Sequence, residues 1–311
     1  MMSSAAKAGS ARERRRATAR TVRPRRSVLY MPGSNRRALE KARALPADAL
    51  ILDLEDAVAP DAKEAARATI QEALGERSAY GLREVIARVN GLNTPWGYDD
   101  LASMAAAPVD AILLPKVESP DLVDIACAIL DVAGAAPDLP IWCMMETPRG
   151  VLRAEAIADH PRVGCLVMGT SDLVTDVQAQ HTPMRLPMLV SLGACLLAAR
   201  AAGIAVLDGV YLDLDDEAGF AASCRQGREL GFDGKTLIHP KQLAAANAAF
   251  GPSPEEVARA RAIIAAFEEA QAAGKGLVVV NGKLVENLHV AEAKRHLAHY
   301  EAIAALEAGA A

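Results

Sequence analysis

Eight short apolar runs, separated by alanine-rich segments, constrain the fold of this chain more than any other feature. The runs have the length of buried strands, and most of the segments between them repeat apolar residues with helical spacing. The runs are SVLYM at 27–31, ALILDL at 49–54, EVIARV at 84–89, AILLPK at 111–116, PIWCMM at 140–145, GCLVMG at 164–169, IAVLDG at 204–209 and KTLIHP at 235–240. Eight β/α units within about 225 residues predict a (β/α)₈ TIM barrel.

A doubly wound open sheet is the alternative fold. It usually has fewer strands and a glycine-rich first turn. No G-x-G-x-x-G motif follows the run at 27–31, so the barrel is the favoured prediction, with expected bounds of 27–252. Of the 311 residues, 51% are hydrophobic, which is enough material for a large buried core.

The chain continues beyond the predicted barrel as an appendage over residues 253–311. Residues 254–273 have an amphipathic helical pattern, with a proline near the start and a glycine beyond the end. Two apolar runs then flank Asn281-Gly282, the dipeptide that most strongly indicates a hairpin. A last helix is expected at about 290–307. Because a lone hairpin is not stable, it must pack on its own barrel or on a neighbouring subunit.

Positive charge is concentrated in the first 26 residues. They contain Lys7 and eight arginines against one acid, Glu13, whereas the whole chain has a net charge of −5. The remainder of the chain is therefore acidic, and no nucleic-acid partner is expected. We expect residues 1–26 to be a disordered basic tail. An organellar import segment, which is also rich in arginine and serine, is the less favoured interpretation.

Two further patterns exclude classes of protein. No apolar run reaches the roughly 18 residues that a transmembrane helix needs, so no membrane association is expected. The five cysteines show no C-x-x-C spacing, which argues against a disulfide framework and a ribbon-type zinc site. This pattern is typical of a reducing compartment, and we expect a cytoplasmic location.

Two acidic residues follow consecutive predicted strands at the end where a barrel of this kind carries its active site. Glu146 follows the fifth strand and Asp172 follows the sixth. Neighbouring strands lie about 5 Å apart, so two carboxylates there repel each other unless a cation or a proton lies between them. Mg²⁺, which often takes only one or two carboxylates, suits this pair. Helix capping is the competing interpretation for Asp172 and for Asp56.

Groups that bind anions are expected beside these acids. Arg88 ends the third strand, and a guanidinium binds a carboxylate through two parallel hydrogen bonds. The turn Gly169-Thr170-Ser171 offers backbone N–H groups to an anion. The pattern therefore predicts a site for a carboxylate ligand next to a divalent cation.

Seven stretches of the sequence resemble the citrate lyase β-subunit-like family, within the wider group of HpcH/HpaI-type aldolases. They are RSVLYMPGSN at 26–35, LDLEDAV at 52–58, RVN at 88–90, LPKVE at 114–118, METPRGV at 145–151, MGTSDL at 168–173 and FDGKTLIHP at 232–240. The resemblance runs in register from about Arg26 to the C-terminus. It implies a (β/α)₈ barrel that binds a CoA thioester and Mg²⁺, with Mn²⁺ as a substitute ion.

The resemblance also implies roles for the residues that bind metal and carboxylate. Glu146 and Asp172 would hold the Mg²⁺ ion. Arg88 would bind the carboxylate of a 2-oxo acid or of its hydroxyacyl form. The backbone at Gly169, Thr170 and Ser171 would help to hold that carboxylate.

Five further residues receive roles from the resemblance alone. Glu55 and Asp56 would order the arginine and the water at the metal. Arg26, Arg36 and Lys116 would lie near the CoA.

The implied activity is that of a carbon–carbon lyase. Such an enzyme cleaves or forms a 3-hydroxyacyl-CoA, such as malyl-CoA, β-methylmalyl-CoA or citramalyl-CoA. The products of cleavage are glyoxylate or pyruvate, together with acetyl- or propionyl-CoA. The alternatives are a thioesterase on the same substrates, a citrate lyase β subunit acting on a carrier-bound citryl thioester, and a non-enzymatic binder of CoA esters.

One departure from the family pattern lies in the predicted hairpin. Family lyases commonly carry G-x-M-I-D there, and the aspartate completes a neighbouring subunit's site as an acid/base. This chain has GKLVE at 282–286, so Glu286 supplies a carboxylate with one more methylene. The resemblance further implies a homotrimer, or a dimer of trimers, in which the appendage reaches a neighbouring subunit.

Overall fold

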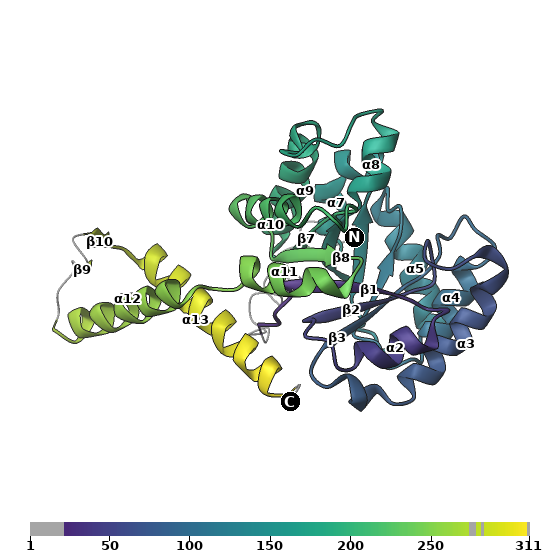
Figure 1. The fold of residues 1–311 in the computed structure, drawn as a ribbon, viewed down its shortest axis with the longest axis horizontal. Coiled ribbons are helices and arrows are strands. Elements are labelled where there is room, and N and C mark those ends of the chain that lie inside the picture. The colour runs from purple at the N-terminus through teal and green to yellow at the C-terminus, as the bar shows by residue number, and fades with distance from the viewer. Residues whose placement is uncertain (1–21, 274–277, 281–282, 310–311) are drawn as a thin grey trace, which may run out of the picture. The chain divides into compact units, whose positions relative to one another are not determined.

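The computed structural model describes residues 22–273, 278–280 and 283–309. Eight parallel strands form a closed barrel in the order β1 to β8 (Figure 1). The strands are β1 Ser27–Pro32, β2 Ala49–Asp53, β3 Glu84–Arg88, β4 Ala111–Leu114, β5 Ile141–Met145, β6 Val163–Met168, β7 Ala205–Asp208 and β8 Gly234–Leu237. They fall on the eight predicted apolar runs, so the predicted (β/α)₈ barrel is confirmed.

Helices connect the strands and form the outer layer. The α-helices of the barrel are α2 Arg36–Ala42, α3 Lys63–Leu74, α4 Gly97–Met104, α5 Pro120–Val132, α6 Pro148–Leu152, α7 Ala154–Ala158, α8 Thr170–Asp176, α9 Leu189–Ala202, α10 Glu217–Leu230 and α11 Leu243–Phe250. Short 3₁₀ helices are η1 Pro60–Ala62, η2 Arg77–Tyr80, η3 Leu186–Met188 and η4 Pro240–Gln242. A large apolar cluster, including Leu52, Ile70 and Leu166, packs the helices against the sheet. Both faces of the strands are therefore buried, which explains their nearly continuous apolar runs.

Alternate residues of the strands fill the inside of the barrel with a second apolar cluster. Its members include Val28, Ile51, Ile86, Trp142, Met144 and Val167. Because side chains alternate across a strand, the residue two positions after an inward-facing one also faces inward. Asp53, Arg88 and Glu146 each follow a member of this cluster by two positions, so they face into the barrel at its C-terminal end.

Arg25 and Arg26 close the opposite end of the barrel. Arg26 donates from Nε and Nη2 to the two carboxylate oxygens of buried Asp48, at 2.9 and 2.8 Å. Arg25 donates to Glu84 at 2.6 and 2.8 Å and lies 5.1 Å from the centre of the Trp142 ring. The sequence pattern placed both arginines in the disordered tail. The structure places them in the barrel, because the two buried carboxylates need cationic partners.

Of the described residues, 22–24, 251–273, 278–280 and 283–309 belong to a second compact unit. In it, α12 Pro254–Ala272 packs against α13 Asn287–Ala308, and β9 Val278–Val280 pairs antiparallel with β10 Lys283–Val285. A small apolar cluster that includes Ile263 and Val290 joins these elements. Helix, hairpin and helix follow each other in the predicted order. The predicted turn at Asn281-Gly282, the glycine expected after the first helix and tail residues 1–21 lie outside the described residues.

None of the helices in the described part of the chain has both the length and the apolar character needed to cross a bilayer. All five cysteines are buried free thiols. Cys143 and Cys165 lie inside strands, where they act as small core residues.

Removing the Arg26–Asp48 pair should lower the free energy of unfolding far more than removing an exposed aspartate that also precedes a barrel strand. Asp48→Ala leaves a buried guanidinium without its carboxylate, and we expect the free energy of unfolding to fall by about 3 kcal/mol. Asp138→Ala is the control, because Asp138 is exposed shortly before β5. Urea denaturation of both variants measures the difference. Equal midpoints for the two would contradict the structural role of the pair.

Candidate active site

A cavity of about 390 Å³ opens at the C-terminal end of the barrel strands. Its charged lining comes from Asp53, Asp56, Arg88, Glu146 and Asp172. Its apolar lining includes Tyr30, Met144, Met168, Val210, Leu212 and Ile238. Residues far apart in the sequence meet here because parallel strands bring their carboxyl ends to one edge of the barrel.

Arg88 is held by carboxylates of its own chain. Its Nε and Nη2 donate to the two oxygens of Asp53 at 2.7 and 2.6 Å, since these residues are register partners on β2 and β3. Its Nη1 lies 2.7 Å from Glu55 Oε2 and 3.3 Å from Asp56 Oδ2. The guanidinium carbon lies 4.8 Å from the centre of the Tyr30 ring, a distance typical of a cation–π contact.

The predicted role of Arg88 in binding a ligand carboxylate stays a prediction. Asp53 already occupies the two-pronged edge that was expected to grip a ligand carboxylate. On the Nη1 side, Asp56 is exposed and lines the cavity. Glu55 does not line the cavity. It lies beside the arginine and supports its position.

Lys116 contacts both acids that were predicted to hold a metal. Its backbone N–H donates to Glu146 Oε1 at 2.7 Å, and its Nζ lies 3.1 Å from Asp172 Oδ2. Lys116 has a φ of 49°, a left-handed conformation that is uncommon for a residue other than glycine. A Cβ atom at Gly169 would lie 2.4 Å from the Cβ of Glu146. Only glycine at position 169 therefore leaves room for this carboxylate.

The pKa values of two glutamates are raised to about 7. For Glu146 the largest cause is burial, the Lys116 N–H opposes it, and the charge of Asp172 adds to it. For Glu55 the largest cause is again burial, which the charge of Arg88 opposes and that of Asp56 reinforces. Each carboxylate lacks enough positive charge around it to stay fully ionised at neutral pH.

The residues present fit a divalent cation. Within the described part of the chain, Glu146 Oε2 and Asp172 Oδ1 have no hydrogen-bond or ion-pair partner. The Lys116 ammonium already places one positive charge on Asp172. No group of three or more His, Cys, Asp or Glu side chains suited to a metal occurs among the described residues. A metal here would take most ligands from water or substrate, as Mg²⁺ commonly does.

The turn Gly169-Thr170-Ser171 differs partly from its predicted role. The Gly169 N–H donates to the Met145 carbonyl at 3.1 Å, so it is not available to a ligand. Thr170 and Ser171 line the cavity, and the Ser171 hydroxyl is buried with no hydrogen-bond partner among the described residues. A ligand in this cavity could therefore meet Thr170 and Ser171, whereas the Gly169 N–H is already used.

Within the barrel, Arg26 and Arg36 do not line this cavity. Arg36 begins α2 and forms ion pairs with Glu40 and Glu72, at 3.1 and 2.9 Å. Glu286 lies in the second unit, where it caps the start of α13. Arg26 is not brought to the mouth at all, because it precedes β1 and so lies at the opposite end of the barrel from the cavity.

Sequence reasoning gave no role to Asp53 or Tyr30, although both shape the site. The alternation of side chains along the strands indicates that both face inward. Asp53 follows inward-facing Ile51, and Tyr30 follows inward-facing Val28, each by two positions. The same rule excludes Asp208, another residue at a strand end. It follows inward-facing Leu207 directly, so it faces the helices instead of the cavity.

The fold and cavity define a (β/α)₈-barrel enzyme whose mouth combines an arginine with a ring of carboxylates. The chain belongs to the HpcH/HpaI aldolase/citrate lyase family, whose model matches residues 26–240. The family predicted from the sequence motifs is therefore confirmed.

Two relatives and one solved structure illustrate the similarity. The chain is 55% identical to the (3S)-malyl-CoA thioesterase of Cereibacter sphaeroides strain KD131 over 285 residues, which are 92% of this chain and 98% of that protein. It is 36% identical to the citrate lyase subunit beta of Escherichia coli K12 over 288 residues, covering 91% and 95%. The crystal structure of CitE from Mycobacterium tuberculosis with magnesium, acetoacetate and coenzyme A superposes with a TM-score of 0.71, at 28% identity, covering 88% and 97%.

The raised pKa of Glu146 predicts a pH-dependent gain in stability for Glu146→Gln in EDTA. The folded state holds this proton more tightly than the unfolded chain does. Protonated Glu146 therefore makes its full contribution to the free energy of unfolding below about pH 4.5. That contribution is lost as the pH rises through about 7. Glu146→Gln should consequently be more stable than the parent at pH 8, with the advantage vanishing near pH 5.

Thermal melts across this pH range test that expectation. Glu118→Gln serves as the control, since Glu118 lies half exposed near Arg149. A pH-independent difference between Glu146→Gln and the parent would show that burial of charge is not the cause.

Proposed function

We propose that this chain hydrolyses the thioester of a malyl-CoA-type 3-hydroxyacyl-CoA in a Mg²⁺-dependent reaction. The observation that carries the proposal is the 55% identity to proteins named (3S)-malyl-CoA thioesterase, extending over 98% of their length. The cavity supports it, because it offers a cation for the malyl carboxylate and two acids for a metal. Hydrolysis thus takes precedence over the carbon–carbon cleavage favoured from the sequence motifs.

The substrate's free carboxylate would bind at the Nη1 side of Arg88, close to Thr170 and Ser171, where it would replace the 3.3 Å contact to Asp56. Asp53 fixes the guanidinium through two hydrogen bonds, and Glu55 supports it from the third side. The apolar lining of Met144, Met168 and Ile238, among others, would exclude water from around the acyl group. Arg88 therefore positions the substrate without moving.

Glu146 and Asp172 are the residues that would hold Mg²⁺. Mg²⁺ bound there would act as a Lewis acid and stabilise negative charge that develops on the substrate oxygens. Arg36 and Lys116, on the same end of the barrel, are the cations proposed for the CoA phosphates. Arg26 is not proposed to bind the CoA phosphates, because it lies at the N-terminal end of the barrel.

Asp56 is the proposed general base, because it lines the cavity and is exposed to water. Its carboxylate would accept a proton from the water whose oxygen attacks the thioester carbonyl carbon. The C–S bond then breaks, and the proton passes from Asp56 to the departing CoA thiolate. The products are a free hydroxydicarboxylate and CoA thiol.

Incubation with (3S)-malyl-CoA and Mg²⁺ tests the reaction directly. We expect mass spectrometry to show malate and free CoA, and EDTA to abolish both. Asp56→Asn should lower turnover about 100-fold, in keeping with the loss of a general base. Asp61→Asn, an exposed aspartate nearby in sequence, should behave as the parent. Acetyl-CoA and glyoxylate as the products would replace the proposal by a lyase.

A carbon–carbon lyase is the second candidate, favoured by the 36% identity to citrate lyase β subunits. Such an activity would use Glu286 as the acid/base of a neighbouring subunit within a homotrimer. In the second unit Glu286 is exposed at the start of α13. Its backbone N–H donates to His289 Nδ1 at 3.0 Å, and its carbonyl accepts the His289 N–H at 3.0 Å. Its exposed carboxylate is therefore one that a neighbouring subunit could reach.

Mixed oligomers test the role of Glu286. Glu286→Ala and Asp172→Asn should each be inactive as a lyase alone, and mixing the two after dissociation should restore part of the activity. Partial recovery requires that one subunit supplies the acid/base and another the metal site. Full hydrolase activity in Glu286→Ala, without recovery in the mixture, would assign the reaction to the barrel alone.

A further inference from the structure

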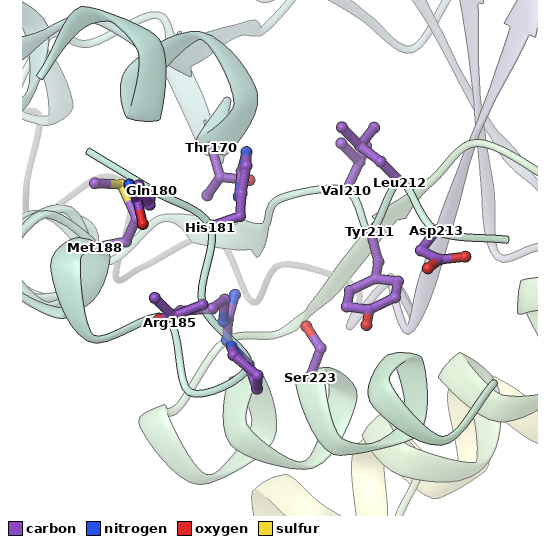
Figure 2. A pocket seen from close by; sticks show the side chains of 12 residues that line it. Thr170, Gln180, His181, Arg185, Met188, Val210, Tyr211, Leu212, Asp213 and Ser223 are labelled. Carbon is purple, nitrogen blue, oxygen red and sulfur yellow. The ribbon is translucent and has the colours of Figure 1, made fainter. Parts of the chain in front are cut away.

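A second cavity, of about 330 Å³, lies beside the candidate active site. The two cavities share Thr170, Val210 and Leu212 as a common wall. The other walls come from the loop between α8 and η3, from the segment after β7 and from α10 (Figure 2). Nothing in the proposed reaction uses this space.

Three residues that line this cavity each carry a buried polar atom without a partner among the described residues. Arg185 Nη2, Thr182 Oγ1 and Ser223 Oγ are buried and have no hydrogen-bond partner among the residues that the structure describes. Ser223 is only 3% exposed. Figure 2 shows its hydroxyl pointing from α10 toward the space between Arg185 and Tyr211. Because buried polar groups are almost always hydrogen-bonded, three of them around one cavity indicate a ligand.

The charged groups around Arg185, on one side of this cavity, carry a net positive charge. Asp208 accepts hydrogen bonds from Arg185 Nη1 at 2.6 Å and from Lys235 Nζ at 2.8 Å. Lys235 and Asp208 are fully buried, and Arg185 Nε donates to the neutral Gln226 at 2.7 Å. Two cations therefore share one carboxylate. A buried surplus of positive charge favours an anion nearby.

The backbone holds Arg185 in place for this contact. Arg185 has a φ of 50°, in the left-handed region that residues other than glycine rarely adopt. Such strain persists only where surrounding contacts over-determine it, and it is frequent in ligand-binding loops. Here the contacts are those to Asp208 and Gln226.

The other residues that line this second cavity favour an organic carboxylate over a phosphate. Met188, Val210 and Leu212 are apolar, and the Tyr211 hydroxyl is already committed to Asp216 at 2.6 Å. Asp213 lines the cavity on the Tyr211 side and accepts the backbone N–H groups of residues 215 and 216. Its negative charge keeps an anion at the Arg185 end. A short apolar chain with one carboxylate matches this distribution better than a phosphate does.

We propose that this cavity is a binding site for a small organic carboxylate, separate from the candidate active site. The carboxylate would meet Arg185 Nη2 and the hydroxyls of Ser223 and Thr182. The apolar part would lie against Met188 and the shared wall. A molecule of this class bound here would touch the same Thr170 that lines the candidate active site.

Isothermal titration of the full chain with butyrate tests the proposal. The Arg88→Gln background in EDTA removes carboxylate binding at the candidate active site. We expect saturable binding of butyrate and none of butyramide, its neutral analogue. Arg185→Lys should weaken butyrate binding about tenfold, since an ammonium cannot reproduce the guanidinium geometry. Ser223→Ala should weaken it about fivefold, through the loss of one hydrogen bond.

Matched controls separate binding from folding. Arg162→Lys is the control for Arg185→Lys, because Arg162 also has a buried, unpartnered Nη2 among the described residues but lines neither of these cavities. Ser223→Leu should fill the cavity and abolish binding with a cooperative thermal melt retained. Equal binding of butyrate and butyramide, unchanged affinity in Ser223→Ala, or tighter binding of inorganic phosphate than of butyrate would each overturn the assignment.

Discussion

The site of this protein depends on the strict alternation of side chains along the strands of a closed parallel barrel. Each strand sends every second residue inward, and the apolar inner layers end where the strands end. The next inward positions are occupied by Asp53, Arg88 and Glu146. A shift of one residue in any of these strands would turn its charged side chain toward the helices, where Asp208 and Lys235 already form a buried pair.

Burial of charge is the second constraint, and it acts differently at the two ends of the barrel. At the N-terminal end, Asp48 and Glu84 are matched by Arg26 and Arg25, so the charges balance and stabilise the closed barrel. At the C-terminal end, acids outnumber cations. Burial, reinforced by the charge of Asp172, raises the pKa of Glu146 and makes the mouth receptive to a proton or a metal. Such an excess destabilises the free protein and is typical of a functional site.

Much of the fold and part of the site could be predicted from the sequence. The eight strands, the C-terminal helix–hairpin–helix and the gathering of Glu146 with Asp172 follow from apolar periodicity and strand order. The two hydrogen bonds from Arg88 to Asp53 could not be predicted, because they depend on the register of β2 against β3. The link that Lys116 makes between the two acids depends on a left-handed backbone conformation that residue type does not indicate. The position of Arg26 at the N-terminal end of the barrel could not be predicted either, because a motif shared with the family does not indicate which end of the barrel a residue occupies.

The sequence by itself determined the barrel class and the family, since eight apolar runs and a set of contiguous motifs are local properties of the chain. Only the tertiary structure decided which charged groups share one cavity and which form ion pairs with other side chains. It also revealed the second cavity, whose unpartnered groups come from a loop and from a helix far along the chain. The physical reason is that hydrogen-bond satisfaction and desolvation depend on all neighbours in space, whereas periodicity depends only on neighbours in sequence.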